Sequence, residues 1–160
     1  HGVDFVSLMP TNLYGPEDNF DLETSHVLPA LIRKFHEAKA GNAPVQLWGS
    51  GTPKREFMYV DDLADAILHV LQTEEATLYA AAPDGLINAG VGEDLAISEL
   101  AEKIQQTVGS TNSVVYDASK PDGTPRKLVD VERLFSLGWR PSVSLEEGLR
   151  RTYDWFIANH

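Results

Sequence analysis

Hydrophobic positions along the chain follow two kinds of pattern. Short apolar runs bounded by Gly, Pro or polar residues predict strands at residues 3–8, 45–48, 55–60, 86–89 and 113–116. Apolar residues three and four positions apart predict helices at residues 27–40, 61–71, 98–108, 130–137 and 145–158. Strands that alternate with helices indicate an α/β fold, and the long loops at 11–22 and 74–85 favour a small mixed sheet.

Polar residues mark where these helices begin and end. Thr24 or Ser25 can cap the first helix, and Gly41-Asn42 is expected to end it. Asp61 and Asp62 open the second helix, where carboxylates favour the positive end of the helix dipole. Ser98 is expected to cap the third helix.

Composition narrows the function classes. The chain has 160 residues, 24 acidic and 13 basic, for a net charge of −11, which argues against a nucleic-acid partner or an anionic membrane surface. No apolar run approaches the roughly 18 residues that cross a bilayer. The absence of Cys excludes disulfides and thiolate chemistry within these residues, and the cytoplasm is the default compartment. The first residues lack an initiator Met and lead directly into a strand, so we expect a fragment of a longer chain.

Two common nucleotide-binding signatures are missing. No GxGxxG turn is present, since Gly90-Val-Gly92 lacks a third glycine, and no P-loop pattern occurs. The one Tyr-x-x-x-Lys, Tyr116 to Lys120, ends a strand-like run and is followed by Pro121. A lysine lowers a phenol pKa in this motif only when one helical turn stacks the two side chains, so the match is interpreted as coincidence.

Basic residues concentrate in turns and on the first helix, as the pairs Arg33-Lys34, Lys54-Arg55 and Arg126-Lys127. In an acidic protein, cations held on rigid turns are candidates for an anion site of diphosphate size. The alternative is that they are solvated surface charges.

Three further features carry candidate chemistry. Trp48 offers an aromatic face for a base or sugar, or is an ordinary core residue. His26, at the start of the first helix, is a candidate general acid or base, or only caps or packs there. Asp61-Asp62 resembles a metal pair, but helix capping is simpler and no third ligand is evident, so no metal site is predicted.

Several motifs together resemble the C-terminal part of the extended short-chain dehydrogenase/reductase family, over essentially all 160 residues. Those common to its nucleotide-sugar epimerases and dehydratases are Pro-Thr-Asn-Leu-Tyr-Gly at 10–15 and Arg-Glu-Phe at 55–57 with Val-Asp-Asp at 60–62. More specific to its GDP-sugar 3,5-epimerase-4-reductases are Ser-His-Val at 25–27 and Lys-Pro-Asp-Gly-Thr-Pro-Arg-Lys at 120–127.

The resemblance implies a fold and a set of site residues. Residues 1–160 are expected to hold the last strands of a Rossmann sheet and a small mixed α/β substrate-binding domain. The nicotinamide end of NADP would be contacted by Pro10, Thr11, Asn12 and Leu13. His26 would lie by cofactor and substrate and return a proton to carbon. The diphosphate would be held by Lys34, Arg55 and Lys127, and the nucleotide-sugar would be contacted by Trp48 and Asp122.

The implied activity is epimerisation at C3 and C5 of GDP-4-keto-6-deoxy-D-mannose, followed by reduction at C4 with NADPH. NADP would be bound mainly by an N-terminal Rossmann half that is absent here, so the fragment alone is expected to be inactive. The complete enzyme is expected to be a homodimer. Two alternatives remain, namely another nucleotide-sugar epimerase or dehydratase, and a non-catalytic nucleotide-binding or scaffold domain.

Overall fold

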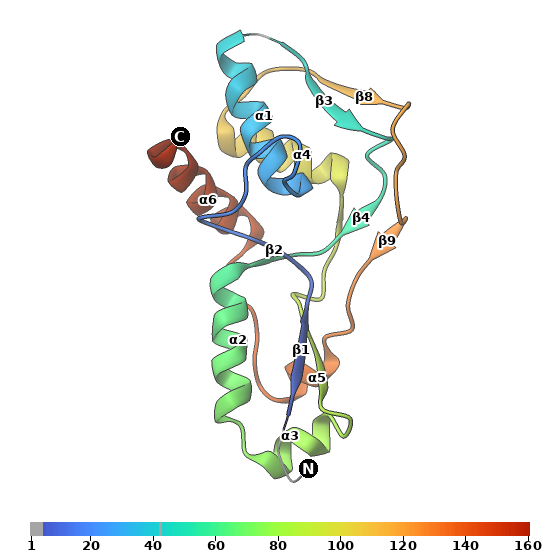
Figure 1. Ribbon diagram of the computed structural model, residues 1–160, viewed down its shortest axis with the longest axis vertical. Helices are drawn as coiled ribbons and strands as arrows, with labels where there is room; N and C mark the ends of the chain where they lie inside the picture. Colours follow the sequence, from blue (N-terminus) through green and yellow to red (C-terminus); the bar gives the residue numbers. More distant parts are fainter. Residues whose placement is uncertain (1–4, 42) are drawn as a thin grey trace.

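The computed structural model describes residues 5–41 and 43–160 of the chain. Helices and strands follow one another along it as shown in Figure 1. They are β1 (Ser7–Pro10), β2 (Asn12–Tyr14), α1 (Val27–Gly41), β3 (Val45–Trp48), β4 (Lys54–Arg55), β5 (Phe57–Tyr59), α2 (Val60–Gln72), α3 (Glu75–Ala81), β6 (Leu86–Ala89), β7 (Leu95–Ala96), α4 (Ile97–Val108), β8 (Val114–Asp117), β9 (Arg126–Lys127), α5 (Glu132–Ser136) and α6 (Leu145–Asn159).

The predicted helices form where apolar spacing places them, but two of the expected caps are wrong. The first hydrogen bond of α1 runs from the Ala30 N–H to the His26 carbonyl, so neither Thr24 nor Ser25 occupies the cap position. Helix α4 begins at Ile97, which puts Ser98 inside it. At α4 the N–H groups of Ile97 and Ser98 donate to the carbonyls of Pro53 and Gly51, and a local cap signal does not encode these tertiary contacts.

Strand pairing differs from the expected small mixed sheet. Within the described part of the chain the strands form four separate groups, with β1 parallel to β6, β2 parallel to β5, β3 parallel to β8, and β4 between antiparallel β7 and parallel β9. Of these four groups, the last is mixed. The strands are two to four residues long.

Several predicted boundaries also shift. The strand expected at 55–60 is divided between β4 and β5, and Val60 begins α2. The strand expected at 3–8 is β1 at Ser7–Pro10, and residues 3 and 4 of that prediction lie outside the described residues, as does Asn42 at the predicted end of α1. Part of the predicted loop 74–85 is helix α3. Its sequence, Glu-Ala-Thr-Leu-Tyr-Ala-Ala, contains good helix formers, but its one buried residue, Leu78, leaves no readable apolar stripe.

The molecule is elongated and has two hydrophobic cores, one toward each end (Figure 1). The core among α1, α4 and α6, here named the upper core, includes Leu28, Ile32, Phe35, Leu100, Ile104, Leu149 and Phe156. The core among α2, α3, α5 and β6, here named the lower core, includes Ala66, Val70, Leu78, Ile87, Leu134 and Trp139.

The β2–β5 pair lies between these two cores. Phe57 and Tyr59 belong to the upper core, whereas Met58 belongs to the lower core. Successive side chains of a strand point to opposite faces, so β5 contributes to both cores and all three of its residues are buried. Strand β5 therefore lies at the junction between the two halves of the molecule.

Candidate functional site

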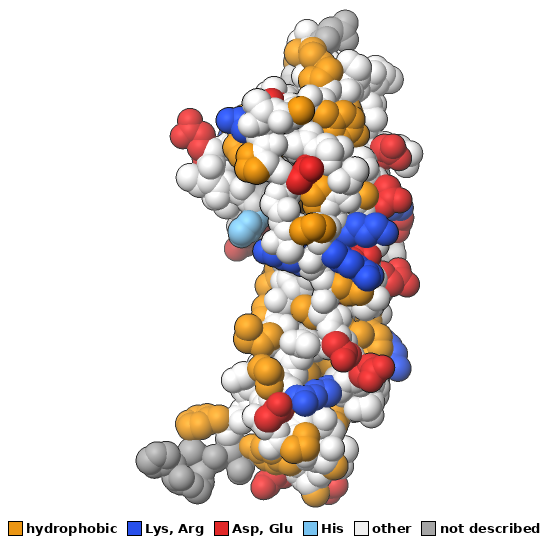
Figure 2. Space-filling model, turned by 90° about the vertical axis from the view of Figure 1, so that its right-hand side faces the viewer, with side chains coloured by type: hydrophobic (Ala, Val, Ile, Leu, Met, Phe, Trp, Pro, Cys, Tyr) orange, Lys and Arg blue, Asp and Glu red, His pale blue; other side chains and the backbone are white. Residues whose placement is uncertain are grey.

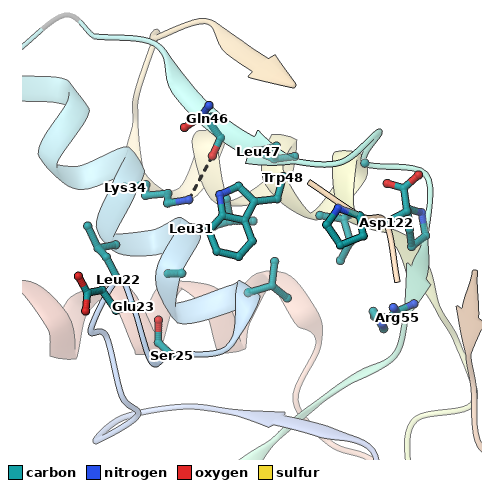
Figure 3. A pocket seen from close by; sticks show the side chains of 16 residues that line it. Leu22, Glu23, Ser25, Leu31, Lys34, Gln46, Leu47, Trp48, Arg55 and Asp122 are labelled. Atoms are coloured by element: carbon teal, nitrogen blue, oxygen red, sulfur yellow. Dashed lines mark hydrogen bonds between the residues drawn. The ribbon is translucent and has the colours of Figure 1, made fainter. Parts of the chain in front are cut away.

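A cavity of about 290 Å³ lies beside α1, the end of β3 and the turn that follows it (Figure 3). Leu31, Leu47 and Ile97 contribute to its apolar wall. Its polar and aromatic lining residues are Glu23, Ser25, Lys34, Gln46, Trp48, Arg55 and Asp122. Four of the five residues predicted to hold substrate, namely Lys34, Trp48, Arg55 and Asp122, thus meet at one cavity although they come from four different segments of the chain.

Trp48 and Lys34 form the central part of this lining. The indole is 59% exposed, so Trp48 is not an ordinary core residue. Lys34 Nζ lies 5.7 Å from the ring centroid of Trp48 and donates a hydrogen bond of 3.2 Å to the Gln46 carbonyl. Burial lowers the pKa of Lys34. Lys120 Nζ also lies 5.2 Å from the Trp48 ring centroid, which places two cations beside one aromatic surface.

Strand β4 brings Arg55 beside Lys127 of β9. The two residues are register partners in parallel strands, so their side chains leave the same face of the sheet. Arg55 lines the cavity and Lys127 does not, which places Lys127 next to the cavity rather than in its wall. The two cations are 72 positions apart in sequence, and the pairing of β4 with β9 brings them together.

The opposite face of β4 and β9 carries Lys54 and Arg126, also register partners. Asp94 forms an ion pair with Arg126. The hydrogen bond from Arg126 lowers the pKa of Asp94 most, and the charge of Lys54 lowers it less. Arg33 likewise pairs with Glu37. Within residues 5–41 and 43–160, no ion pair engages the three cations predicted to hold the diphosphate, Lys34, Arg55 and Lys127. Figure 2 shows Lys and Arg side chains gathered near the middle of this side of the molecule, with acidic side chains beside them.

Asp122 is bound to the turn that follows β3. Its carboxylate accepts hydrogen bonds from the Ser50 N–H at 2.6 Å and from the Ser50 hydroxyl at 2.9 Å. Gly49 has φ +72°, and a Cβ there would lie 2.2 Å from Asp122 Oδ1. The turn therefore requires glycine both for its conformation and for the approach of Asp122.

Replacement of Gly49 by Ala is expected to destabilise the chain by about 1–3 kcal/mol, because the left-handed conformation is strained for Ala and the carboxylate must move. Urea unfolding measures this change. Gly41→Ala is the control, since no atom that the structure describes, its chain neighbours aside, lies within 4 Å of a Cβ at that helix end. If both variants have the same stability, the turn does not depend on glycine.

His26 lies in the loop that enters α1, next to two residues that line the cavity, Ser25 and Val27. Its side chain is exposed and is not part of the cavity wall. Burial raises the pKa of the neighbouring Asp18, and His26 exerts a smaller opposing influence on it. The histidine predicted to act as an acid is therefore free to meet a bound molecule that extends beyond the cavity.

Pro10 to Leu13, predicted to contact the nicotinamide, lie where β1 ends and β2 begins. Pro10 pairs with Ala89 at the carboxyl end of the parallel β1–β6 pair, the end of parallel strands where cofactors bind in open α/β folds. The Thr11 hydroxyl and the Asn12 amide both donate to the Glu56 carbonyl, at 3.2 and 2.7 Å. Leu13 lies in β2 beside Met58.

Sequence reasoning missed three residues around this region. Ser25 lines the cavity with a buried hydroxyl that has no hydrogen-bond partner within the described part of the chain. Gln46 lines the cavity and accepts the Lys34 hydrogen bond through its carbonyl. Glu56, which stands between Arg55 and Phe57 in the sequence, is completely buried. A carboxylate inside an otherwise apolar strand pattern is the signal that could have identified Glu56.

The other sequence candidates have structural roles. Asp62 accepts hydrogen bonds from the N–H and hydroxyl of Ser142 and from the Val143 N–H, so it anchors the segment before α6 rather than capping α2. Tyr116 lies in β8, not on a helix, as expected for a coincidental Tyr-x-x-x-Lys match. Across residues 5–41 and 43–160, no group of three or more His, Asp or Glu is arranged to hold a metal ion. No helix in that part of the chain is long and apolar enough to span a membrane.

Comparison with known proteins identifies a family. The model of the NAD dependent epimerase/dehydratase family matches residues 1–82. The GDP-L-fucose synthase of Escherichia coli K12 is 57% identical over 162 residues, which cover 99% of this chain and 50% of that protein. GDP-L-fucose synthase 1 of Arabidopsis thaliana is 52% identical over 160 residues, again 99% of this chain and 47% of that protein. The chain thus spans about half the length of the curated relatives it matches.

Solved structures share the fold. A GDP-6-OMe-4-keto-L-xylo-heptose reductase from C. jejuni superposes with a TM-score of 0.91 at 31% identity, covering 100% of this chain and 56% of that one. A GDP-L-fucose synthetase from Naegleria fowleri bound to NADP superposes with a TM-score of 0.84 at 32% identity, covering 97% and 47%. The fold is that of the C-terminal part of extended short-chain dehydrogenase-type enzymes, as predicted.

Proposed function

The chain belongs to the NAD-dependent epimerase/dehydratase family, and from this membership we propose that it is the substrate-binding portion of a GDP-L-fucose synthase. The complete enzyme would epimerise C3 and C5 of GDP-4-keto-6-deoxy-D-mannose and reduce C4 with NADPH. The observation that carries the proposal is the meeting of Lys34, Trp48 and Arg55 at one cavity, with Lys127 beside it. Identity of 57% to the E. coli enzyme over 99% of the chain supports the choice of substrate.

The cavity residues suit the two ends of a nucleoside diphosphate. Arg55 and Lys127 share one sheet face without an ion-pair partner in the described residues, and guanidinium and ammonium groups bind phosphate oxygens strongly. Trp48 presents a half-exposed ring on which a base or sugar can pack. Asp122, held by Ser50, adds acceptor oxygens for sugar or ribose hydroxyls.

The nicotinamide end of NADP suits Pro10, Thr11, Asn12 and Leu13, because they lie at and directly after the carboxyl end of β1. No glycine-rich phosphate-binding turn occurs in this sequence. NADPH supplies the hydride for reduction at C4 when it is bound. The rest of the cofactor would be held by an N-terminal Rossmann half, with residues 1–160 forming the substrate-binding C-terminal portion.

His26 would act as the acid that returns a proton to carbon. The 4-keto group acidifies the protons at C3 and C5, so a base removes each proton and an acid delivers one to the other face. An exposed imidazole next to the cavity can reach a sugar that projects from it. The base and the group that protonates the C4 oxygen would come from the N-terminal half, and a cytoplasmic homodimer remains the prediction for the complete enzyme.

Loss of either diphosphate-binding cation is expected to weaken substrate binding. In the complete enzyme, Arg55→Ala and Lys127→Ala should each raise KM about 10- to 100-fold, since hydrogen bonds to charged groups contribute about 1.5–3 kcal/mol. Lys54→Ala is the matched control, because Lys54 neighbours Arg55 but points to the opposite face, toward Asp94. Initial rates with the GDP-sugar measure KM. Equal effects of all three substitutions would contradict the diphosphate role.

The proposed activity is tested by turnover of the complete enzyme. GDP-4-keto-6-deoxy-D-mannose and NADPH should yield a product inverted at C3 and C5 and reduced at C4, as read by NMR. Turnover of a UDP-sugar instead would favour the alternative epimerase or dehydratase. No turnover of any nucleotide-sugar would favour a binding or scaffold domain.

A further inference from the structure

Glu56 is buried at the junction between the two halves of the molecule. It precedes β5, whose residues contribute to both the upper and the lower core, and its side chain is 0% exposed. A carboxylate is rarely buried completely unless hydrogen bonds compensate the loss of water. The contacts of Glu56 therefore indicate what holds the junction together.

The carboxylate of Glu56 binds two segments that cross between the halves. Oε1 accepts hydrogen bonds from the N–H groups of Val91 and Gly92, at 2.6 and 2.8 Å, in the connection between β6 and β7. Oε2 accepts one from the Val129 N–H at 3.0 Å, two residues beyond Lys127. A Cβ on Gly90 would lie 2.4 Å from Oε1, so the chain approaches this carboxylate closely at a glycine.

The backbone of Glu56 binds a third segment. Its carbonyl accepts from the Thr11 hydroxyl and the Asn12 amide, next to the carboxyl end of β1. Arg55, the adjacent residue, lines the cavity. One residue thus connects the cation pair Arg55 and Lys127 with Thr11 and Asn12.

We propose that Glu56 is a positioning residue that fixes the substrate-binding cations relative to the nicotinamide end of the site. The identity of the ligands at the two ends of the site rests on the proposed function. The orientation of the two halves, which Glu56 fixes, does not depend on it. A carboxylate provides acceptors for all three N–H groups. A glutamine has one acceptor oxygen and directs an NH2 group toward an N–H donor, so Glu56→Gln keeps the size of the side chain and breaks the junction.

The structural part is tested by distance measurements between spin labels. The chain has no Cys, so Glu75→Cys on α3 and Gln106→Cys on α4, both exposed, place one label in each half. Glu56→Gln is expected to broaden the distance distribution. Leu134→Ala, which removes a buried side chain from the lower core, is the control for general loss of stability and should leave it narrow. An unchanged distribution in Glu56→Gln would overturn the proposal whether or not the chain acts on a GDP-sugar.

The functional part is tested in the complete enzyme. Glu56→Gln should leave the Kd of GDP and the Kd of NADPH within about twofold, because the residues at each end of the site are unchanged. It should lower kcat about 10- to 100-fold, because the substrate-binding cations and the nicotinamide end are no longer fixed relative to each other. Leu134→Ala, compared below both unfolding transitions, should retain kcat. A kcat of Glu56→Gln equal to that of Leu134→Ala would overturn the positioning role. If the unsubstituted enzyme does not turn over GDP-sugars, the proposed function fails and the label distances alone decide the proposal.

Discussion

Glu56→Ala is expected to lower the free energy of unfolding by about 3–6 kcal/mol. The substitution leaves the partly buried N–H groups of Val91, Gly92 and Val129 without their acceptor, and each unsatisfied donor costs about 1–3 kcal/mol. Water that enters the vacated space offsets part of this cost. Because domains of this size are stable by only about 5–15 kcal/mol, the variant should unfold at markedly lower urea concentration.

Glu93→Ala is the matched control for this experiment. Glu93 follows Gly92 directly, but its side chain is exposed, so its loss should change stability by no more than about 0.5 kcal/mol. Urea unfolding followed by far-UV circular dichroism measures both variants. A Glu56→Ala chain as stable as Glu93→Ala would show that the hydrogen bonds of Glu56 do not hold the two halves together.

His26→Asn is expected to slow proton return at C3 and C5 about 100- to 10,000-fold in the complete enzyme, the range that a positioned general acid contributes. Reduction at C4 does not need this acid, so the reduced sugar should accumulate with its C3 and C5 configuration unchanged. The configuration at C3 and C5 of the product, read by NMR, measures the epimerisation separately from NADPH oxidation.

His160→Asn provides the comparison, because His160 is exposed at the end of α6 and stacks on Phe156, away from the cavity. It should retain normal epimerisation. Normal inversion at C3 and C5 in His26→Asn would contradict the role of His26 as the acid.

Local patterns predicted the long elements well and the short strands poorly. Helix α1 buries Leu28, Leu31, Ile32 and Phe35 at helical spacing, so its pattern is readable without the rest of the fold. Strands β7 and β9 have two residues each and exist because they pair with β4. Such strands have no periodicity to read, and their existence depends on contacts between distant segments.

The same distinction applies to the site. Trp48 and Arg55 lie close in sequence around one turn, and their association could be predicted from that turn. The pairing of Arg55 with Lys127 requires the β4–β9 register, which no local pattern encodes. Composition also could not distinguish Arg55 and Lys127 from Arg126, since the ion pair of Arg126 with Asp94 forms only in the folded chain. The resemblance to a family assigned Arg55 and Lys127 to the same diphosphate, which the spacing of residues could not do.

We propose that this chain binds a GDP-sugar in the cavity bounded by Lys34, Trp48 and Arg55. Isothermal titration calorimetry of the 160-residue chain with GDP and with UDP tests this binding, because the two ligands share the diphosphate and differ only in the base. GDP is expected to bind at least about tenfold more tightly than UDP, a difference of about 1.4 kcal/mol. Equal affinity for both nucleotides, or no detectable binding of either, would contradict the claim.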